Sequence, residues 1–330
     1  MNQKTYPPET AGRKMIENVP LAFSKEKILD VKKRLFEKME EFETINYIYV
    51  VNQDKKLLGV FSVKEVFRKP EENKVEEIMQ TEVIKARPYT DQERIALLAL
   101  KYNLKAIPVV DKEEHFLGVV TSDTILDILH SEHIEDILRS AGVHNSVYFP
   151  SKVMKTPVGI LAKARIPWLI IGLLGGILGA QIANFFETPL QTHFALVAFI
   201  PLMVYMADAV GTQTQTLIAR NLALDLGFSF KKYLLKEIKV SLLIALILGI
   251  FLSIISILWY RLLFLGLILG ISLFLTIITA IFIGSLIPYL LQKFKQDPAI
   301  GSGPFATIIT DICSLGIYFS VATILLKFFR

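Results

Sequence analysis

The chain has 330 residues, of which 52% are hydrophobic and 20% charged, and its net charge is +5. Residues 1–150 carry 25 of the 31 acidic and 22 of the 36 basic residues, so residues 151–330 keep 6 acidic and 14 basic ones. The basic excess therefore lies beside long apolar runs, which is typical of membrane anchoring and not of nucleic-acid binding. The single cysteine, Cys313, excludes an internal disulfide and a cysteine-based zinc or redox site.

The first half of the chain is an internal repeat. Residues 50–62 align without a gap with residues 109–121, at a constant offset of 59. Each copy predicts a strand, a polar turn, a second strand and a helix, with strands at 45–51 and 57–61 and again at 106–110 and 116–120. An amphipathic helix is expected ahead of each copy. Its apolar positions are Ile28, Val31, Leu35 and Met39 in the first copy and Ile95, Leu98, Ala99 and Tyr102 in the second.

This α+β repeat resembles a tandem pair of CBS domains, with copies at about 12–70 and 75–140 in a domain of residues 1–142. The resemblance implies a regulatory module that binds ATP, another adenine nucleotide or ions. In the family a hydroxyl after the second strand contacts phosphate and an acid three residues later contacts ribose. Ser62 and Glu65 match that pattern, whereas in the second copy Thr121 is followed by its acid at Asp123. A purely structural or cation-sensing pair is the alternative.

Acidic residues are numerous toward the end of this half. Most are expected to face solvent, and a minority facing each other across a dimer would form weak sites for divalent cations, because hard oxygen ligands suit Mg²⁺ and Ca²⁺. The candidates for such a regulatory metal site are Glu71, Glu72, Glu76, Asp123, Asp127, Glu132, Glu135 and Asp136.

The second half predicts an all-α polytopic membrane domain at 166–330. A helical pattern ends at Gly142, and residues 143–165 form a connecting segment with a short basic amphipathic stretch at 158–165. Basic residues before the first span and between later spans predict a cytoplasmic amino terminus, an external carboxyl terminus and a place in the cell membrane. Five spans are expected, at 167–186, 190–222, 234–259, 262–291 and 304–328.

Polar residues interrupt two of these spans. Asp311 lies in the middle of the last one, where an ionised carboxylate costs several kcal/mol unless a cation, a partner or water compensates it. A hydrogen bond between helices by a protonated acid is the simpler explanation. Helical spacing places Asp208, Thr212 and Gln215 on one face of the second span, and Thr307, Asp311, Ser314 and Tyr318 on one face of the last. Carboxylate, hydroxyl and amide oxygens suit a hard hydrated cation, and are poor ligands for copper or zinc.

Together with the repeat and the five spans, three motifs resemble the MgtE family of magnesium channels: residues 10–15 (TAGRKM), residues 165–168 (RIPW) and residues 297–311 (DPA through TD). The resemblance implies a homodimer with a pore on its two-fold axis, in which Asp311 binds hydrated Mg²⁺ and Asp297 lies toward the cytoplasmic mouth. It also implies that Mg²⁺ bound among the CBS acids closes the pore through a connecting helix within residues 148–164.

The chain departs from the family pattern in two places. The acidic helical domain that usually precedes the CBS pair has no counterpart before the repeat, so gating by cytoplasmic Mg²⁺ is expected to be incomplete. In the second span, Ala209 and Thr212 stand where two asparagines are usual, and Asp208 is an additional acid.

We therefore expect a homodimeric Mg²⁺ channel or transporter and not an enzyme. One alternative is an exporter, or a sodium- or proton-coupled exchanger, of Mg²⁺ or of another divalent cation such as Co²⁺ or Mn²⁺. A remote alternative is an intramembrane aspartyl protease with Asp208 and Asp311 as its acid pair. The Gly-x-Gly-Asp motif of that class is missing, since Ile309 and Thr310 precede Asp311.

Overall fold

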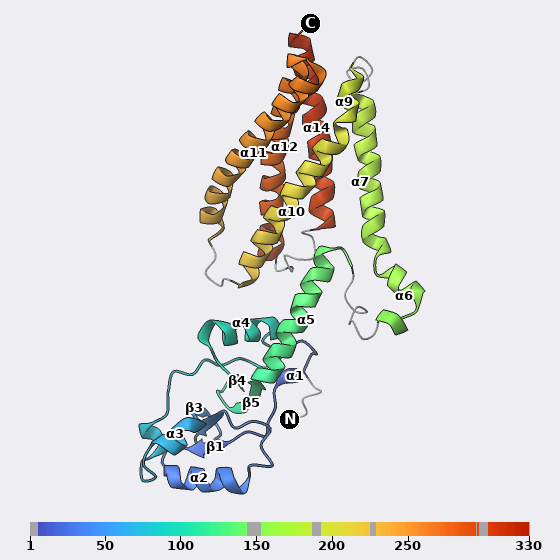
Figure 1. Cartoon of the computed structure of the whole chain (residues 1–330). Coiled ribbons are helices and arrows are strands. Elements are labelled where there is room, and N and C mark those ends of the chain that lie inside the picture. The colour runs from blue at the N-terminus through green and yellow to red at the C-terminus, as the bar shows by residue number, and fades with distance from the viewer. Residues whose placement is uncertain are drawn as a thin grey trace. The chain divides into compact units, whose positions relative to one another are not determined.

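The computed structural model describes residues 6–143, 153–186, 193–224, 229–294, 296 and 303–329. The chain divides into two compact units, Met1–Ile134 and Glu135–Arg330 (Figure 1). The predicted residue Asp297 and part of the predicted connecting helix lie outside the described residues.

In the first unit, the first repeat builds a three-stranded sheet of β1 (Leu21–Phe23), β2 (Tyr47–Val51) and β3 (Leu57–Ser62). Strand β1 is parallel to β2, and β3 is antiparallel to β2. The helices of this repeat are α2 (Ile28–Glu37) and α3 (Val63–Arg68), followed by a short 3-10 helix at Val75–Glu77. Apolar residues of α2 and both long strands form one core, because alternate strand residues and one helix face point inward.

The second repeat pairs β4 (Ala106–Val110) with β5 (Phe116–Thr121) in an antiparallel sheet, between α4 (Gln92–Tyr102) and α5 (Ser122–Ser140). A parallel bridge from Ala86 to Val109 takes the place that β1 has in the first repeat. The strand, turn, strand and helix order predicted for each copy is confirmed. The parallel strand β1 and the Ala86 bridge were not predicted, because segments of so few residues show no periodicity.

The last apolar position predicted for each amphipathic helix does not face the core. Helix α2 stops at Glu37, so Met39 lies beyond it and is 43% exposed. Tyr102, the last residue of α4, is 46% exposed. The prediction that these two residues face the core is therefore wrong, while Ile28, Val31, Leu35, Ile95 and Ala99 are buried as predicted.

Matching glycines mark where another backbone segment crosses each sheet. A Cβ atom on Gly118 would lie 2.4 Å from the main-chain oxygen of Ile16, and one on Gly59 would lie 2.8 Å from that of Gln80. The neighbouring residues form isolated bridges to the same two segments. Only glycine allows this close approach, which explains why it occupies the same place in both copies.

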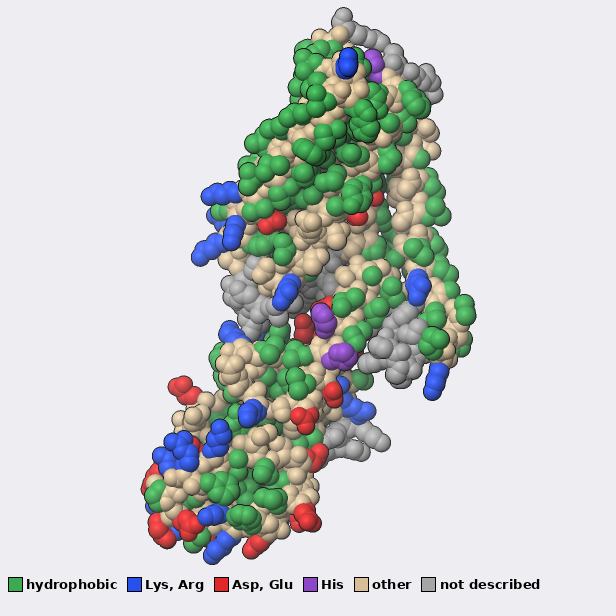
Figure 2. Space-filling view, in the orientation of Figure 1, with side chains coloured by type: hydrophobic (Ala, Val, Ile, Leu, Met, Phe, Trp, Pro, Cys, Tyr) green, Lys and Arg blue, Asp and Glu red, His purple; other side chains and the backbone are tan. Residues whose placement is uncertain are grey.

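Among its described residues, the second unit contains five helices, or helix pairs, that are long and apolar enough to cross a membrane. Hydrophobic side chains cover much of their visible surface, whereas charged side chains gather over the first unit (Figure 2). A short helix, α6 (Val158–Lys163), precedes them. The helices are α7 (Ile166–Phe185), α9 (Phe194–Ala198) with α10 (Ile200–Leu224), α11 (Phe230–Tyr260), α12 (Leu263–Lys293) and α14 (Pro304–Phe328). An α+β pair followed by five apolar spans is the predicted fold class, which is confirmed.

Helix α12 is the centre of this bundle. It packs against α10, α11 and α14, and more than half of its most apolar stretch is buried. Its contact with α11 is close because a Cβ atom on Gly249 or on Gly270 would lie 2.8 Å from the main-chain oxygen of the other. Small residues at such crossings let two helix backbones approach, and dispersion contacts then stabilise the pair.

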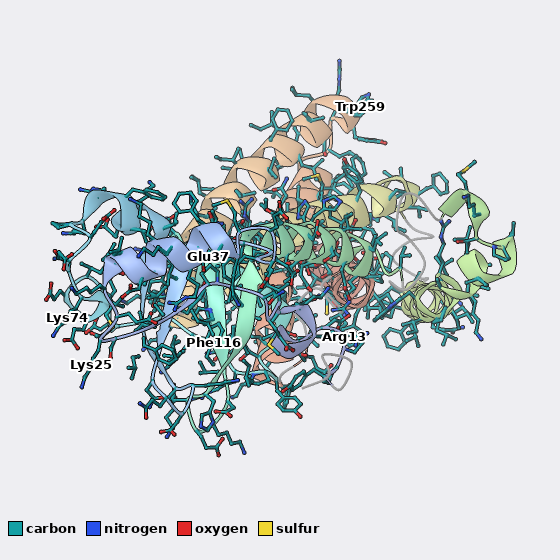
Figure 3. All side chains as sticks on the ribbon, turned by 90° about the horizontal axis from the view of Figure 1, so that it is seen from below. Arg13, Lys25, Glu37, Lys74, Phe116 and Trp259 are labelled. Atoms are coloured by element: carbon teal, nitrogen blue, oxygen red, sulfur yellow. The ribbon has the colours of Figure 1, made fainter. Side chains whose placement is uncertain are left out.

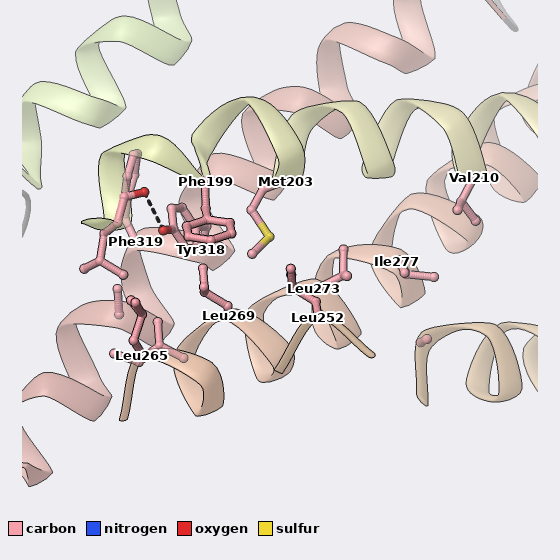
Figure 4. Close-up of a cluster of buried hydrophobic side chains, with 14 of the residues drawn as sticks. Phe199, Met203, Val210, Leu252, Leu265, Leu269, Leu273, Ile277, Tyr318 and Phe319 are labelled. Atoms are coloured by element: carbon pink, nitrogen blue, oxygen red, sulfur yellow. Dashed lines mark hydrogen bonds between the residues drawn. The ribbon is translucent and has the colours of Figure 1, made fainter. Parts of the chain in front are cut away.

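The second span is broken between α9 and α10. Pro201 has no N–H to donate to the preceding turn, so the helical hydrogen bonding is interrupted at this point. The hydroxyl of Tyr318 donates to the main-chain oxygen of Leu196 in α9 at 2.7 Å, within an apolar cluster that includes Phe199, Met203 and Phe319 (Figure 4). This bond fixes the short helix against α14.

We expect Gly118→Ala to destabilise the second repeat by about 1–3 kcal/mol, because the new methyl group meets rigid backbone. Gly59→Ala should cost less, since its nearest backbone atom is farther away and its other neighbour is the flexible side chain of Met79. Hydrogen–deuterium exchange of β3 and β5 in the full chain measures both effects. An equal or smaller effect at Gly118 contradicts the crossing geometry.

Candidate metal site

Asp311 is the eighth of the 25 residues of α14 and is half-buried. Its Oδ1 atom is buried and accepts no hydrogen bond from any described residue. The hydroxyl of Ser314 donates at 2.8 Å to the main-chain oxygen of Asp311, so this proton is not donated to the carboxylate. A buried carboxylate oxygen without a donor is costly, so a cation, water or a proton must compensate it.

A second acid, Asp208 of α10, lies close enough to Asp311 for the two carboxylates to interact electrostatically. The hydroxyl of Thr307 in α14 donates to Oδ1 of Asp208 at 2.9 Å and so orients this carboxylate. Neither acid forms an ion pair with a described residue. Thr307 precedes Asp311 by about one helical turn, so both carboxylates lie near this hydroxyl between α10 and α14, and no described cation forms an ion pair with either acid.

A cavity of about 360 Å³ lies beside Asp311, between α7, α10 and α14. Asp311 belongs to its wall, and the other lining residues are apolar or glycine. Gly175 and Gly179 pack on Ile308 and Leu315 of α14, whereas Gly172 and Gly176 face open space. Helix α7 thus touches α14 through two glycines and leaves room next to the carboxylate.

The remaining members of the predicted polar faces have other surroundings. Thr212 is exposed, and Gln215 is buried where α10 packs on α12 beside Gly284. Among the described side chains, neither forms a hydrogen bond to Asp208 or Asp311. Tyr318 belongs to the apolar cluster and bonds to Leu196, so the prediction that it belongs to the polar face of α14 is wrong.

One intramembrane acid was missed by the sequence analysis. Glu237 of α11 accepts a hydrogen bond from the hydroxyl of Thr214 at 3.2 Å, and Thr214 is itself buried. Glu237 lies near the start of the predicted span 234–259, but it has four lysines close to it in the sequence, and the acid was not singled out among them. Its position as the eighth residue of an apolar helix was the signal that could have found it.

In the first unit, the predicted nucleotide-binding residues occupy equivalent places at the ends of β3 and β5. The hydroxyl of Ser62 accepts the N–H of Lys64 at the start of α3, and that of Thr121 bonds to Thr124 at 3.1 Å. Glu65 forms an exposed ion pair with Arg68, and Asp123 is exposed and accepts from Ser122. Both hydroxyls therefore have helix-capping partners in this structure.

Lysines pair with the predicted regulatory acids of the first repeat. Lys27 contacts Glu72 at 2.6 Å and Lys32 contacts Glu71 at 2.8 Å, while Lys74 lies 3.9 Å from Glu76. The hydrogen bond and charge of Lys27 lower the pKa of Glu72 below its usual range. Lys25 and Lys74 point outward at one edge of this repeat (Figure 3).

The predicted regulatory acids of α5 have mixed surroundings. Asp127 is exposed, and Glu132 accepts a 2.5 Å hydrogen bond from Gln92. Glu135 forms an ion pair with Arg139, and Asp136 also interacts with another residue. Within one chain, no three of the eight predicted acids come within ligand distance of a single ion among the described residues. A site that needs a second protomer stays a prediction.

A different group, Asp111, Glu113 and His115 in the turn between β4 and β5, has three ligand atoms within 4.8 Å of one another. Asp111 here accepts the main-chain N–H groups of Glu113 and His115, and its second oxygen lies 2.9 Å from Nδ1 of His115. Burial opposes ionisation of Asp111, but the hydrogen bonds and charge of His115 lower its pKa overall. Asn52 makes the equivalent bond to Lys56 in the first repeat, so this carboxylate has a structural role in the turn.

These features define a class: a protein with helices long and apolar enough to span a membrane, two acids between two of those helices, and a pair of α+β repeats ahead of them. Comparison with known proteins agrees with this class. The family profile described as "MgtE: Divalent cation transporter" matches residues 200–321, and the CBS domain profile matches residues 14–72 and 75–131.

The chain belongs to the MgtE family of transporters, which are not enzymes. It is 35% identical over 320 residues to "Magnesium transporter MgtE" of Bacillus subtilis, covering 96% of this chain and 70% of that protein. It is 31% identical over 326 residues to the protein of the same name from Enterococcus faecalis, covering 98% of this chain and 71% of the relative. The solved structure "Crystal structure of the cytosolic domain of the Mg2+ channel MgtE in complex with ATP" is 33% identical, with a TM-score of 0.38, over 38% of this chain and 51% of that chain.

We expect Thr307→Val to weaken divalent-cation binding by the purified protein roughly tenfold, because the charged hydrogen bond that orients Asp208 is lost. Thr307→Ser keeps a hydroxyl at the same place and should retain most of the affinity. Titration with Mn²⁺, followed by electron paramagnetic resonance, measures the free ion. Equal affinities for the valine and serine variants contradict a positioning role for Thr307.

Proposed function

We propose that this chain moves hydrated Mg²⁺ across a membrane as a homodimer. The observation that carries the proposal is the buried Oδ1 atom of Asp311, which no described donor reaches, near a second carboxylate in a bundle of helices long and apolar enough to span a membrane. The relatives that bear the name of magnesium transporters support Mg²⁺ as the ion. The site residues are Asp311, Asp208 and Thr307, with Thr212, Gln215 and Asp297 as further candidates.

The chemistry of Mg²⁺ suits a site of this kind. Mg²⁺ loses its water shell reluctantly, so a carboxylate that accepts hydrogen bonds from that shell avoids most of the dehydration cost. Six waters at about 30 Å³ each occupy roughly 180 Å³, which the cavity of about 360 Å³ beside Asp311 accommodates. Two negative carboxylates attract a divalent ion more strongly than a monovalent one.

A second protomer completes the site in this proposal. Thr212 is exposed on α10, one helical turn after Asp208, and so is available to line a pore shared with a partner. The twofold copy of Asp311 and Asp208 would then place four carboxylates around the ion path. Gln215, buried against α12, would support α10 from behind.

The protein would lie in the cell membrane with its CBS pair in the cytoplasm and its carboxyl terminus outside. The support is the distribution of charge at the helix ends. If the amino terminus is cytoplasmic, most lysines and arginines lie at the cytoplasmic ends of the spans. Arg261 is then the only basic residue in the external loops. Lys327 and Arg330 belong to the outer tail.

The CBS pair would regulate the pore by binding Mg²⁺ and an adenine nucleotide such as ATP. Acids of two protomers that face each other repel, and a divalent ion between them relieves that repulsion. The capping hydroxyls of Ser62 and Thr121 are placed at helix starts, where phosphate is readily bound, with Glu65 and Asp123 nearby. The segment 143–165 would transmit closure.

We predict that Asp311→Asn abolishes Mg²⁺ influx into proteoliposomes, because the neutral amide cannot balance the ion. Glu237→Gln is a matched control, since it removes an intramembrane acid from α11 and should leave influx within about twofold. Undiminished influx in the folded Asp311 variant defeats the assignment. Equal loss in both variants shows that any acid-to-amide change in the bundle is harmful, and removes the special role of Asp311.

Imposed sodium and proton gradients separate the channel from an exchanger on the same scaffold. A channel gives Mg²⁺ flux that follows the Mg²⁺ gradient alone, and an exchanger gives flux that stops when the counter-ion gradient is removed. Parallel measurements with Ca²⁺, Mn²⁺ and Co²⁺ establish the order of selectivity.

Mg²⁺ at millimolar concentration should protect the CBS pair of the full chain from proteolysis, with NaCl at equal ionic strength as control. The physical reason is that ions bound among the acids hold the two protomers together. Combined Asp123→Asn and Asp127→Asn substitutions should reduce that protection, since both carboxylates are exposed on α5 and available to a partner. Cleavage at the same rate with and without Mg²⁺ contradicts regulation by this ion.

A further inference from the structure

A second hollow of the membrane unit, of about 320 Å³, lies between α11 and α12, and the transport site does not use it. Its lining includes Leu234, Ile238 and Leu242 of α11 and Ile278, Ile281 and Phe282 of α12. We call this hollow the α11–α12 groove. Leu242 is 45% and Phe282 50% exposed, so the groove is open along its length to the surroundings of the bundle.

The groove offers no hydrogen bond to a polar ligand. Its two polar lining residues, Ser241 and Thr279, each donate to the main-chain oxygen four residues earlier, at 2.6 and 2.9 Å. Their hydroxyl protons are therefore already used inside the helices. The occupant that fits such a lining is an apolar chain.

The end of the groove near the start of α11 carries aromatic and basic side chains. The rings of Phe230 and Tyr289 stack there, with centroids 3.8 Å apart, and join the start of α11 to the end of α12. Helical spacing places Lys231 on the same face of α11 as Leu234 and Ile238. The same spacing places Lys293 on the face of α12 that carries Tyr289 and Phe282. Both lysines are exposed, and neither forms an ion pair with a described residue.

The distances along the helix match one leaflet of a bilayer. From Lys231 to Leu242 there are eleven residues, which at 1.5 Å each span about 16 Å. Half of a hydrocarbon core is about 15 Å thick. Two cations with an aromatic pair therefore lie at the headgroup level, and the apolar groove extends from them to about the midplane. Lys and Arg side chains are visible at this end of α11 in Figure 2.

We propose that the α11–α12 groove binds one anionic phospholipid, with an acyl chain along the groove and its phosphate between Lys231 and Lys293. Positive charge on both sides favours a net-negative headgroup over a zwitterionic one, because the amine of the latter is repelled by the same lysines. A second copy of this chain does not fit this charge pattern, since it would bring identical lysines together at the same level.

Native mass spectrometry of the full-length protein, with phosphatidylglycerol or phosphatidylcholine of the same acyl chains added, tests the proposal. The wild-type protein should retain phosphatidylglycerol preferentially. The double variant Lys231→Gln, Lys293→Gln should lose affinity for this lipid by about 10- to 30-fold. The matched control Lys232→Gln, Lys236→Gln removes the same charge from the other side of α11 and should lose less than about threefold.

Leu242→Trp tests the acyl-chain part of the proposal, because it narrows the groove at an exposed position and leaves both lysines in place. It should lower binding of phosphatidylglycerol several-fold without changing the mass of the oligomer. Equal loss in the two lysine pairs, or unchanged binding in Leu242→Trp, overturns the proposal. Dissociation of the oligomer in Leu242→Trp also overturns it, since the groove would then hold a second copy of the chain.

Discussion

The membrane unit is organised around the cost of an ionised carboxylate in an apolar helix. Asp311 has a buried oxygen that no described donor reaches, and the acid Asp208 acts on it electrostatically. Two like charges in a low-dielectric surrounding destabilise each other, and a divalent cation bound between them would relieve that repulsion. An ion held by this repulsive pair of acids could bind and also leave again, as the proposed transport function requires.

The rest of the bundle holds this pair without neutralising it. Helix α12 is buried against three neighbours and fixes α10 and α14, the two helices that carry the acids. The crossing at Gly249 and Gly270 packs α11 on α12 tightly, whereas α7 meets α14 through isolated glycines and leaves a cavity beside Asp311. Close packing on one side and open space on the other suit a rigid site with access for a hydrated ion.

Several features of the fold and of the candidate site could be predicted from the sequence. The repeat was evident because the strand and turn chemistry recurs at one offset, and Asp311 stood out because charge in an apolar span is rare. The bond from Thr307 to Asp208 was not predictable, since it depends on how α10 and α14 slide against each other over a separation of 99 residues. Tyr318 was misassigned because spacing along one helix does not say which neighbour its hydroxyl reaches. Glu237 was missed because it lies among four lysines near the start of the predicted span, where an acid is not unusual. The lysine partners of Glu71 and Glu72 likewise come from the tertiary fold, which joins α2 to the segment after α3.

Anomalous scattering from Mn²⁺ bound to the crystallised full-length protein locates the ion relative to the two acids. We expect a peak roughly 4–5 Å from the carboxylate oxygens of Asp311, a separation that leaves water between ion and ligand. The peak should disappear in Asp311→Asn. A structure in which Asp311 is hydrogen-bonded to a neighbouring helix, with no peak between α10 and α14, would contradict the proposed metal site.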